Sequence, residues 1–119
     1  MLERFFRIIG RKFKREYQDV KQNEINRLIK EGAILVDVRS PQEFKEGHLN
    51  GAISLPEYEI KNKAEKILKD KKAPIIVYCT TGQRSKKAQK KLEQKGYVNV
   101  FNLIDGFQNY WDFYISMIK

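Results

Sequence analysis

The chain has 119 residues, 41% of them hydrophobic, which is enough for one globular domain with a modest core. It contains no apolar stretch long enough to span a membrane. Lysine and arginine outnumber aspartate and glutamate by 24 to 15, so the formal net charge is +9. Such a charge is compatible with binding to nucleic acid, to anionic lipid or to small anionic substrates. Because no basic motif interleaved with aromatic residues is visible, we expect small anions and no nucleic acid.

The chain contains a single cysteine, Cys79. It therefore cannot form an internal disulfide or a cysteine-rich metal site, and it has no second cysteine to resolve an oxidised sulfur. We accordingly predict a reducing compartment and a cytoplasmic location. We predict neither a cofactor nor a metal.

Residues 1–16 form a basic amphipathic segment, and we expect the globular domain at 17–119. The segment lacks the uninterrupted apolar core of a secretory signal, and it has two acidic residues and no serine, unlike a transit peptide. Three interpretations stay open: a helix packed on its own domain or on a second copy, a helix on an anionic membrane surface, or a disordered segment. Self-association and a peripheral membrane location through this segment are therefore both retained.

The first elements of the domain are an edge strand over 17–20 and a helix over 22–31, which Gly32 ends. The continuous apolar run 34–38 predicts a strand buried on both faces. Next comes a short helix with a clear start signal and a glycine at its end. Its signal consists of Ser40 as N-cap, Pro41 at the first helical position and Glu43 completing a capping box, and Gly47 ends the helix.

The rest of the chain continues the alternation of strands and helices. The pattern predicts a helix over 56–70, a strand over 75–79, a helix over 85–95, a strand over 97–101 and a final helix with an aromatic stripe from Phe107. In the 56–70 helix we expect Ile60, Ala64, Ile67 and Leu68 to face inward. This alternation favours an α/β fold with a parallel sheet.

Cys79 lies where the apolar run 75–79 ends and a turn-prone loop leads into a helix. In open α/β sheets, ligands bind at the carboxyl ends of strands. Free backbone N–H groups at a helix N-terminus favour an anion, including a thiolate. A lone cysteine is more often an inert buried residue. Here Gly82, Arg84 and the strand–loop–helix context favour a functional one.

At this loop the chain resembles the rhodanese family, whose cysteine loop has the form C-x-x-G-x-R-[ST]. The matching residues are Cys79, Thr80, Thr81, Gly82, Gln83, Arg84 and Ser85. Four residues separate Cys79 from Arg84, whereas five do so in tyrosine and dual-specificity phosphatases and in rhodanese-fold phosphatases and arsenate reductases. A shorter loop suits one extra sulfur atom on the cysteine rather than a tetrahedral phosphate. The spacing therefore favours sulfur chemistry.

A second stretch, 36–56, resembles the rhodanese pattern D-x-R…E-[FYW]…G-H-[IL]-x-G-A. Asp37, at the end of a buried strand, is expected to accept hydrogen bonds from the backbone or from Arg39. The only histidine, His48, is a candidate general base, but the motif implies a scaffold role and a thiolate of low pKa needs no base. A third resemblance is loose, because Asp105 replaces the first glycine of the family's G-G turn.

Together the resemblance covers about residues 20–111 and implies a single rhodanese-like domain, a central parallel sheet flanked by helices on both faces. It implies a sulfurtransferase in which Cys79 takes sulfane sulfur from a donor such as thiosulfate or a persulfide. The Cys79 persulfide then passes the sulfur to a thiol or cyanide, so the partners are a small anionic sulfur donor and a thiol acceptor. The loop residues Thr80, Thr81, Gly82, Gln83, Arg84 and Ser85 would bind the substrate or persulfide, with Asp37 and Arg39 in support.

Two points bear on this expectation. Arg84 would either organise the loop carbonyls or bind the anionic donor. Many active rhodaneses have a basic residue directly after the cysteine, whereas Thr80 and Thr81 stand there in this chain. Lys86 and Lys87 could supply charge instead, or they are solvated lysines of the helix surface. We therefore expect slow turnover with thiosulfate and another physiological donor.

Two alternatives to a sulfurtransferase remain from the sequence. The first is a non-catalytic rhodanese-like binding module, against which the intact Cys79 argues. The second is an enzyme similar to phosphatases or arsenate reductases, against which the spacing of Cys79 and Arg84 argues.

Overall fold

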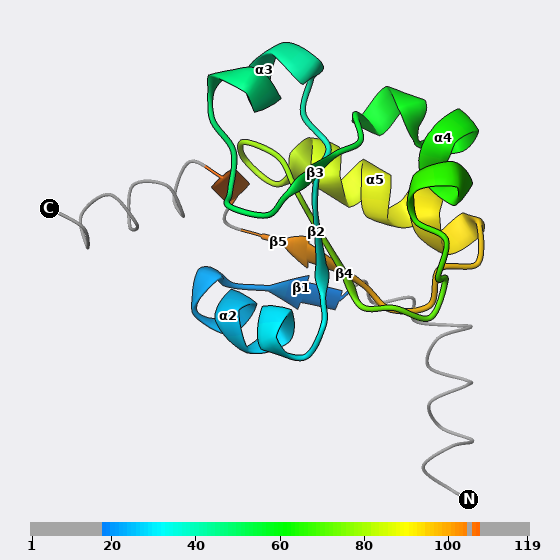
Figure 1. Cartoon of the computed structure of the whole chain (residues 1–119), viewed down its shortest axis with the longest axis horizontal. Helices are drawn as coiled ribbons and strands as arrows, with labels where there is room; N and C mark the ends of the chain where they lie inside the picture. Colours follow the sequence, from blue (N-terminus) through cyan, green and yellow to red (C-terminus); the bar gives the residue numbers. More distant parts are fainter. Residues whose placement is uncertain (1–17, 105, 108–119) are drawn as a thin grey trace, which may run out of the picture.

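In the computed structural model, the described residues are 18–104, 106 and 107, and they form a parallel sheet with helices on both faces (Figure 1). The five strands lie in the order β1-β5-β4-β2-β3, and every neighbouring pair is parallel. They are β1 Gln18–Val20, β2 Ile34–Asp37, β3 Ile53–Ser54, β4 Ile75–Tyr78 and β5 Val100–Leu103. Because the strands are parallel, the residues that follow β2, β4 and β5 meet at one edge of the sheet.

The central strand β4 is buried on both faces, which explains its uninterrupted apolar sequence. Successive side chains of a strand point to opposite faces of the sheet. Ile75 and Val77 pack on one face with Cys79, which directly follows the strand. Ile76 and Tyr78 pack on the other face. The alternation therefore places the Cys79 sulfur on the face of Val77.

The helices divide between these two faces. They are α2 Gln22–Lys30, α3 Pro41–Glu46, the 3₁₀ turn η1 Glu57–Glu59, α4 Ile60–Ile67 and α5 Gln83–Gln94. Helices α4 and α5 cover the face that carries Cys79, through residues such as Ile60, Ala88 and Leu92. Helix α2 covers the opposite face through Ile25 and Leu28. No helix within the described residues is both long enough and apolar enough to cross a membrane.

Several local predictions are confirmed. An edge strand is present at Gln18–Val20, and α2 ends just before Gly32. Ser40 caps α3 and forms the predicted capping box with Glu43: the Glu43 N–H donates to Ser40 Oγ at 3.2 Å, and Ser40 N–H donates to Glu43 Oε1 at 3.1 Å. Residues 1–17 and 108–119 lie outside the described residues, so the domain boundary, the basic segment 1–16 and the final aromatic helix remain predictions.

Other local predictions are wrong. The strand expected at 97–101 is β5 at Val100–Leu103, because the N–H of Val98 bonds to the carbonyl of Lys71 before the strand starts. The helix expected over 56–70 is the short turn η1 followed by α4. Ile67, expected to face inward, is 38% exposed. Helix α5 begins at Gln83 rather than Ser85, and the short strand β3 was not expected.

Candidate active site

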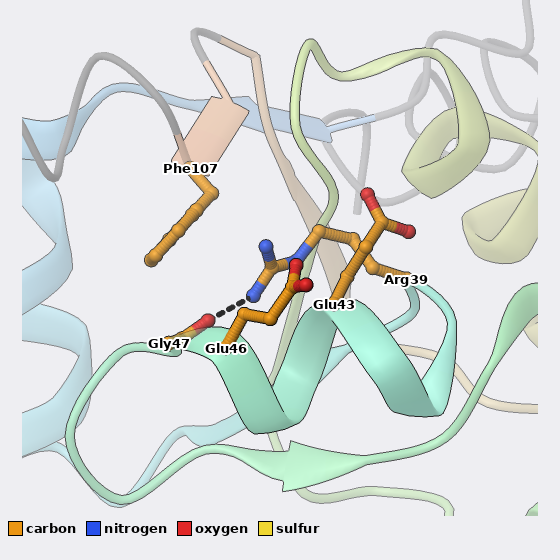
Figure 2. A pocket seen from close by; sticks show the side chains of 5 residues that line it. All are labelled: Arg39, Glu43, Glu46, Gly47 and Phe107. Carbon is orange, nitrogen blue, oxygen red and sulfur yellow. Dashed lines mark hydrogen bonds between the residues drawn. The ribbon is translucent and has the colours of Figure 1, made fainter.

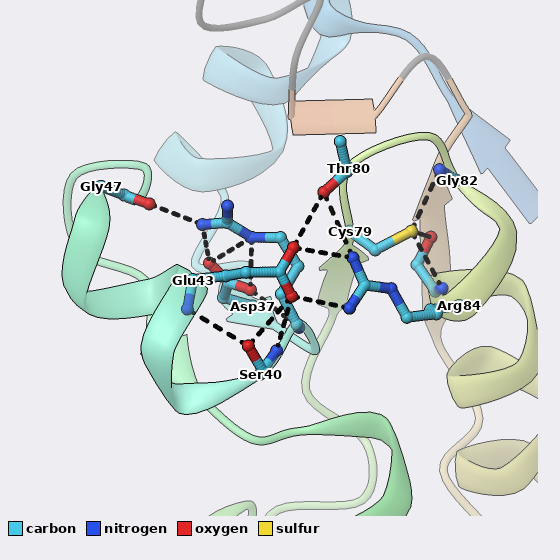
Figure 3. Close-up of polar contacts among 10 residues, drawn as sticks. Asp37, Ser40, Glu43, Gly47, Cys79, Thr80, Gly82 and Arg84 are labelled. Carbon is cyan, nitrogen blue, oxygen red and sulfur yellow. Dashed lines mark hydrogen bonds and ion pairs between the residues drawn. The ribbon is translucent and has the colours of Figure 1, made fainter.

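Cys79 follows β4 directly and lies just before α5, whose N-cap is Gly82. Its sulfur faces hydrogen-bond donors at the start of that helix (Figure 3). The N–H of Gly82 donates to Sγ at 3.0 Å and the N–H of Ser85 donates at 3.4 Å. Ser85 Oγ lies 3.5 Å from Sγ, and the cysteine is only 1% exposed. The loop thus wraps backbone donors around a buried sulfur.

This environment changes the acidity of the thiol in two opposing ways. Burial raises the pKa of Cys79 and is the largest single effect. When the thiol ionises, hydrogen bonds that the sulfur anion can accept from the Ser85 hydroxyl and from the backbone of Ser85, Thr81 and Gly82 lower the pKa, and together they outweigh burial. The pKa of Cys79 therefore lies below its ordinary value of 9.0. A thiolate at this position is both a nucleophile and an anion already provided with donors.

Two glycines shape the loop by allowing backbone to touch backbone. Gly82 has φ +95°, and a Cβ there would lie 2.7 Å from the carbonyl oxygen of Ile104. Gly106 has φ +78°, and a Cβ there would collide with the carbonyl group of Thr80 and lie 2.9 Å from the Cα of Thr81. The segment that follows β5 is therefore packed directly against the loop.

Arg84 contacts Glu43 and Thr80 in the structure. Its Nη1 donates to Glu43 Oε1 at 2.7 Å and its Nη2 donates to Oε2 at 3.0 Å, forming a two-pronged ion pair between α5 and α3 (Figure 3). Nη2 also donates to Thr80 Oγ1 at 3.2 Å. Glu43 thus both completes the capping box of α3 and supplies the carboxylate that matches the charge of Arg84. The sequence signals only the first of these roles, because 41 residues separate the two partners.

Because of this ion pair, we expect part of the stability of the folded chain to depend on pH, and Glu43→Gln should remove that part. The Arg84 guanidinium, the main cause, holds the pKa of Glu43 at about 2, below its ordinary 4.5. Because the folded-state pKa is depressed, the stabilisation is complete above 4.5 and is lost as the pH falls through about 2. Glu43→Gln should therefore unfold at a lower temperature than the native chain above pH 4.5, with the difference shrinking toward pH 2.

Thermal unfolding of both proteins across this pH range measures the effect. Glu31→Gln is the matched control, because it alters an exposed pair with Arg27 in which the side chains are 57% and 62% exposed. A difference between Glu43→Gln and the native chain that stays constant with pH would contradict the role of the ionised carboxylate.

Asp37 and Arg39 form a buried ion pair just after β2. Asp37 is 0% exposed and accepts from the Arg39 backbone N–H at 2.9 Å and from Arg39 Nη2 at 2.6 Å, as the sequence predicts. The guanidinium also donates to the carbonyl of Gly47 and lies 4.1 Å from the centre of the Phe107 ring. The N–H of Phe107 in turn donates to the carbonyl of Cys79 at 2.6 Å. The pair therefore supports the loop through Phe107.

A small pocket of about 220 Å³ opens beside this pair (Figure 2). Its lining residues are Arg39, Glu43, Glu46, Gly47 and Phe107. Arg39 and Glu43 are each already bound to a partner of opposite charge. Helix α3 contributes Glu43 and Glu46 to this lining, whereas Cys79 and Arg84 do not line the pocket.

The other predicted residues take different positions. Thr81 and Gln83 are exposed. His48 Nδ1 donates to the carbonyl of Phe44 at 2.8 Å, and the two rings stack with centroids 3.7 Å apart. These contacts hold the His48 side chain against the C-terminal end of α3. Within the described residues, no three His, Cys, Asp or Glu side chains are grouped so that they could hold a metal ion.

Asn102 was not expected at the site. It lies in β5 opposite Val77, is 2% exposed, and accepts a hydrogen bond from the Ser85 hydroxyl at 2.5 Å. Because the sequence pattern placed Asn102 beyond the end of the last strand, nothing indicated that its side chain would reach the cysteine loop. A strand predicted at its correct position would have indicated this, because Val100 and Asn102 then point to the same face of the sheet.

Comparison with known proteins agrees with this fold. A family model described as "Rhodanese-like domain" matches residues 21–112. Thiosulfate sulfurtransferase GlpE of Pseudomonas entomophila is 31% identical over 93 residues, which cover 78% of this chain and 84% of that protein. Thiosulfate sulfurtransferase PspE of Escherichia coli is 36% identical over 67 residues, or 56% of this chain and 64% of that protein.

A solved structure of a rhodanese-related protein from Thermoplasma volcanium is also similar, with a TM-score of 0.71 and 28% identity. The match covers 81% of this chain and 92% of that one. This chain spans only 60–64% of the length of two curated relatives that it matches at 36–37% identity.

Proposed function

Since this chain belongs to the rhodanese-like domain family, we propose that it is a sulfurtransferase that carries sulfane sulfur on Cys79. The observation that carries the proposal is the set of donors around Sγ. The backbone N–H groups of Gly82 and Ser85 donate to an acceptor that is buried and has a lowered pKa. Such donors stabilise negative charge on sulfur more strongly than water-exposed groups would.

In the first step, the Cys79 thiolate attacks the outer sulfur of the donor. With thiosulfate, the bond between the two donor sulfurs breaks and sulfite leaves with its electron pair, so that Cys79 becomes a persulfide anion. In the second step, a thiolate or cyanide attacks the outer sulfur of the persulfide. The sulfur–sulfur bond breaks and its electrons return to Cys79 as thiolate. No net oxidant or reductant is consumed.

The charges at the loop favour a donor whose reacting sulfur group carries less negative charge than thiosulfate. Thr80 and Thr81 are neutral, and the charge of Arg84 is matched by Glu43 at 2.7 Å. Lys86 and Lys87 lie exposed in the first turns of α5, where solvent screens them. Thiosulfate, whose double charge is concentrated at its reacting group, therefore gains little attraction at this loop. We expect a low-molecular-weight persulfide to load Cys79 faster than thiosulfate does.

The test is the intact mass of the protein after brief incubation with thiosulfate, or with glutathione persulfide, followed by cyanide. The native chain should gain about one sulfur atom, which cyanide removes as thiocyanate, and Cys79→Ser should gain none. Circular dichroism of the variant checks that it folds. No adduct from either donor would favour a non-catalytic binding module, and an adduct on Cys79→Ser would reject Cys79 as the carrier.

A further inference from the structure

The Ser85 hydroxyl lies between two acceptors but has one hydrogen to donate. Its oxygen is 2.5 Å from Asn102 Oδ1 and 3.5 Å from Cys79 Sγ. A carbonyl oxygen has no hydrogen of its own, so the shorter contact requires that Ser85 donate to Asn102. The Asn102 amide is oriented by its Nδ2, which faces the carbonyl of Gly82 at 3.5 Å. As long as Ser85 donates to Asn102, it presents a lone pair, and not its hydrogen, to the sulfur.

This arrangement suits the thiol form of Cys79. The S–H group can donate to Ser85 Oγ, which in turn donates to Asn102, so all three groups are satisfied. A thiolate has no hydrogen, so Ser85 can support it only by rotating its hydroxyl away from Asn102. Asn102 Oδ1, in a residue that is 2% exposed, then loses its donor, which is costly for a buried acceptor. Asn102 and the sulfur anion thus compete for one hydrogen.

We propose that Asn102 is a positioning residue that directs the Ser85 hydroxyl away from Cys79 and thereby restrains formation of the sulfur anion. The inference rests on the proposed use of Cys79 as a nucleophile. The charged groups near the loop are Arg84 of α5 with its partner Glu43 of α3, the pair Asp37 and Arg39 after β2, and the exposed Lys86 and Lys87 of α5. None of them is bonded to Asn102, so their charges stay the same when Asn102 is replaced.

The test is Asn102→Leu, which keeps the size of the side chain and removes the competing oxygen. The pKa of Cys79 should fall, and at a fixed pH below the pKa the rate of alkylation by iodoacetamide should rise up to about tenfold, equivalent to one pKa unit. Because Cys79 is the only cysteine, the pH profile of alkylation reports on it alone. The ultraviolet absorbance of the thiolate gives the pKa without a reagent having to reach the sulfur.

A double-mutant cycle identifies Ser85 as the intermediary. In a Ser85→Ala background, Asn102→Leu should leave the Cys79 pKa unchanged, because no hydroxyl remains to redirect. Gln89→Leu is the matched control: it removes another buried amide of this face, which donates to the carbonyl of Val100 at 3.0 Å, and it should not shift the Cys79 pKa. Asn102→Ala removes the same oxygen and serves if the leucine variant fails to fold.

A Cys79 pKa that does not fall in Asn102→Leu, or that falls equally with and without Ser85, would overturn the proposal. The measurement uses no sulfur donor, so it separates this inference from the proposed function. If Cys79 responds as expected but never gains sulfur, the positioning role stands and the sulfurtransferase proposal fails.

Discussion

Replacing Asp37 by alanine is expected to lower the free energy of unfolding by about 3–5 kcal/mol, as is typical when one partner of a buried ion pair is removed. Asp37 is 0% exposed and accepts hydrogen bonds from Arg39 Nε, Nη2 and backbone N–H at 2.6–3.2 Å. Without it, a guanidinium in a residue that is 5% exposed keeps its charge and loses its carboxylate. The cost is mainly this uncompensated charge.

Chemical denaturation of the native chain and of Asp37→Ala measures the loss. Arg27→Ala is the control, because it breaks an exposed pair with Glu31 and should cost no more than about 1 kcal/mol. Because the Arg39 guanidinium packs on Phe107, we also expect slower sulfur loading by Asp37→Ala molecules that remain folded. Equal losses of stability in Asp37→Ala and Arg27→Ala would show that the buried pair contributes no more than a surface pair.

Gly106→Ala is expected to cost about 2–5 kcal/mol, combining the strain of a left-handed backbone with the overlap of a new methyl group. Its φ is +78°, and the added Cβ would collide with the Thr80 carbonyl. The loop can avoid the overlap only by moving, which would also shift the Gly82 N–H from its 3.0 Å contact with Sγ. We therefore expect persulfide formation to slow more than the stability loss alone explains.

Gly51→Ala separates strain from overlap. Gly51 has φ +85°, but a Cβ there would meet no atom within 4 Å. It should cost only the strain, about 1–2 kcal/mol, and leave the rate of sulfur loading unchanged. Denaturation and the rate of mass gain, measured on both variants, test the comparison. If Gly106→Ala and Gly51→Ala lose the same stability and gain sulfur at the same rate, the close approach of Gly106 to the loop does not affect sulfur loading.

The cysteine loop and its neighbours could be predicted because their signals are local. The apolar run of β4 leads into Cys79, and a helix follows the loop as predicted, although it begins at Gln83 rather than Ser85. Ser40 and Glu43 likewise form their capping box within four residues. In each of these places the residues that decide the structure are adjacent in the sequence.

The start of β5 was misplaced because tertiary contacts override local strand propensity. Tyr97 and Val98 are strand-forming residues, yet the Tyr97 hydroxyl donates to the carbonyl of Leu68 and the Val98 N–H to that of Lys71. Because the predicted strand ended at residue 101, the contact of Asn102 with Ser85 was missed as well. The partnership of Glu43 with Arg84 was missed for a related reason, because no local pattern states which distant element a charged side chain will meet.

The pairing of β1 with β5 has a consequence for the order in which the molecule assembles. Gln18 lies opposite Phe101, so the edge of the sheet joins the two ends of the described chain. Contacts at such separation form late and slow folding. On the ribosome, Cys79 emerges well before Asn102 and Gly106, which complete its surroundings. Until β5 docks, the newly made cysteine therefore lacks the contact of Asn102 with Ser85 and the packing of Gly106 on the cysteine loop.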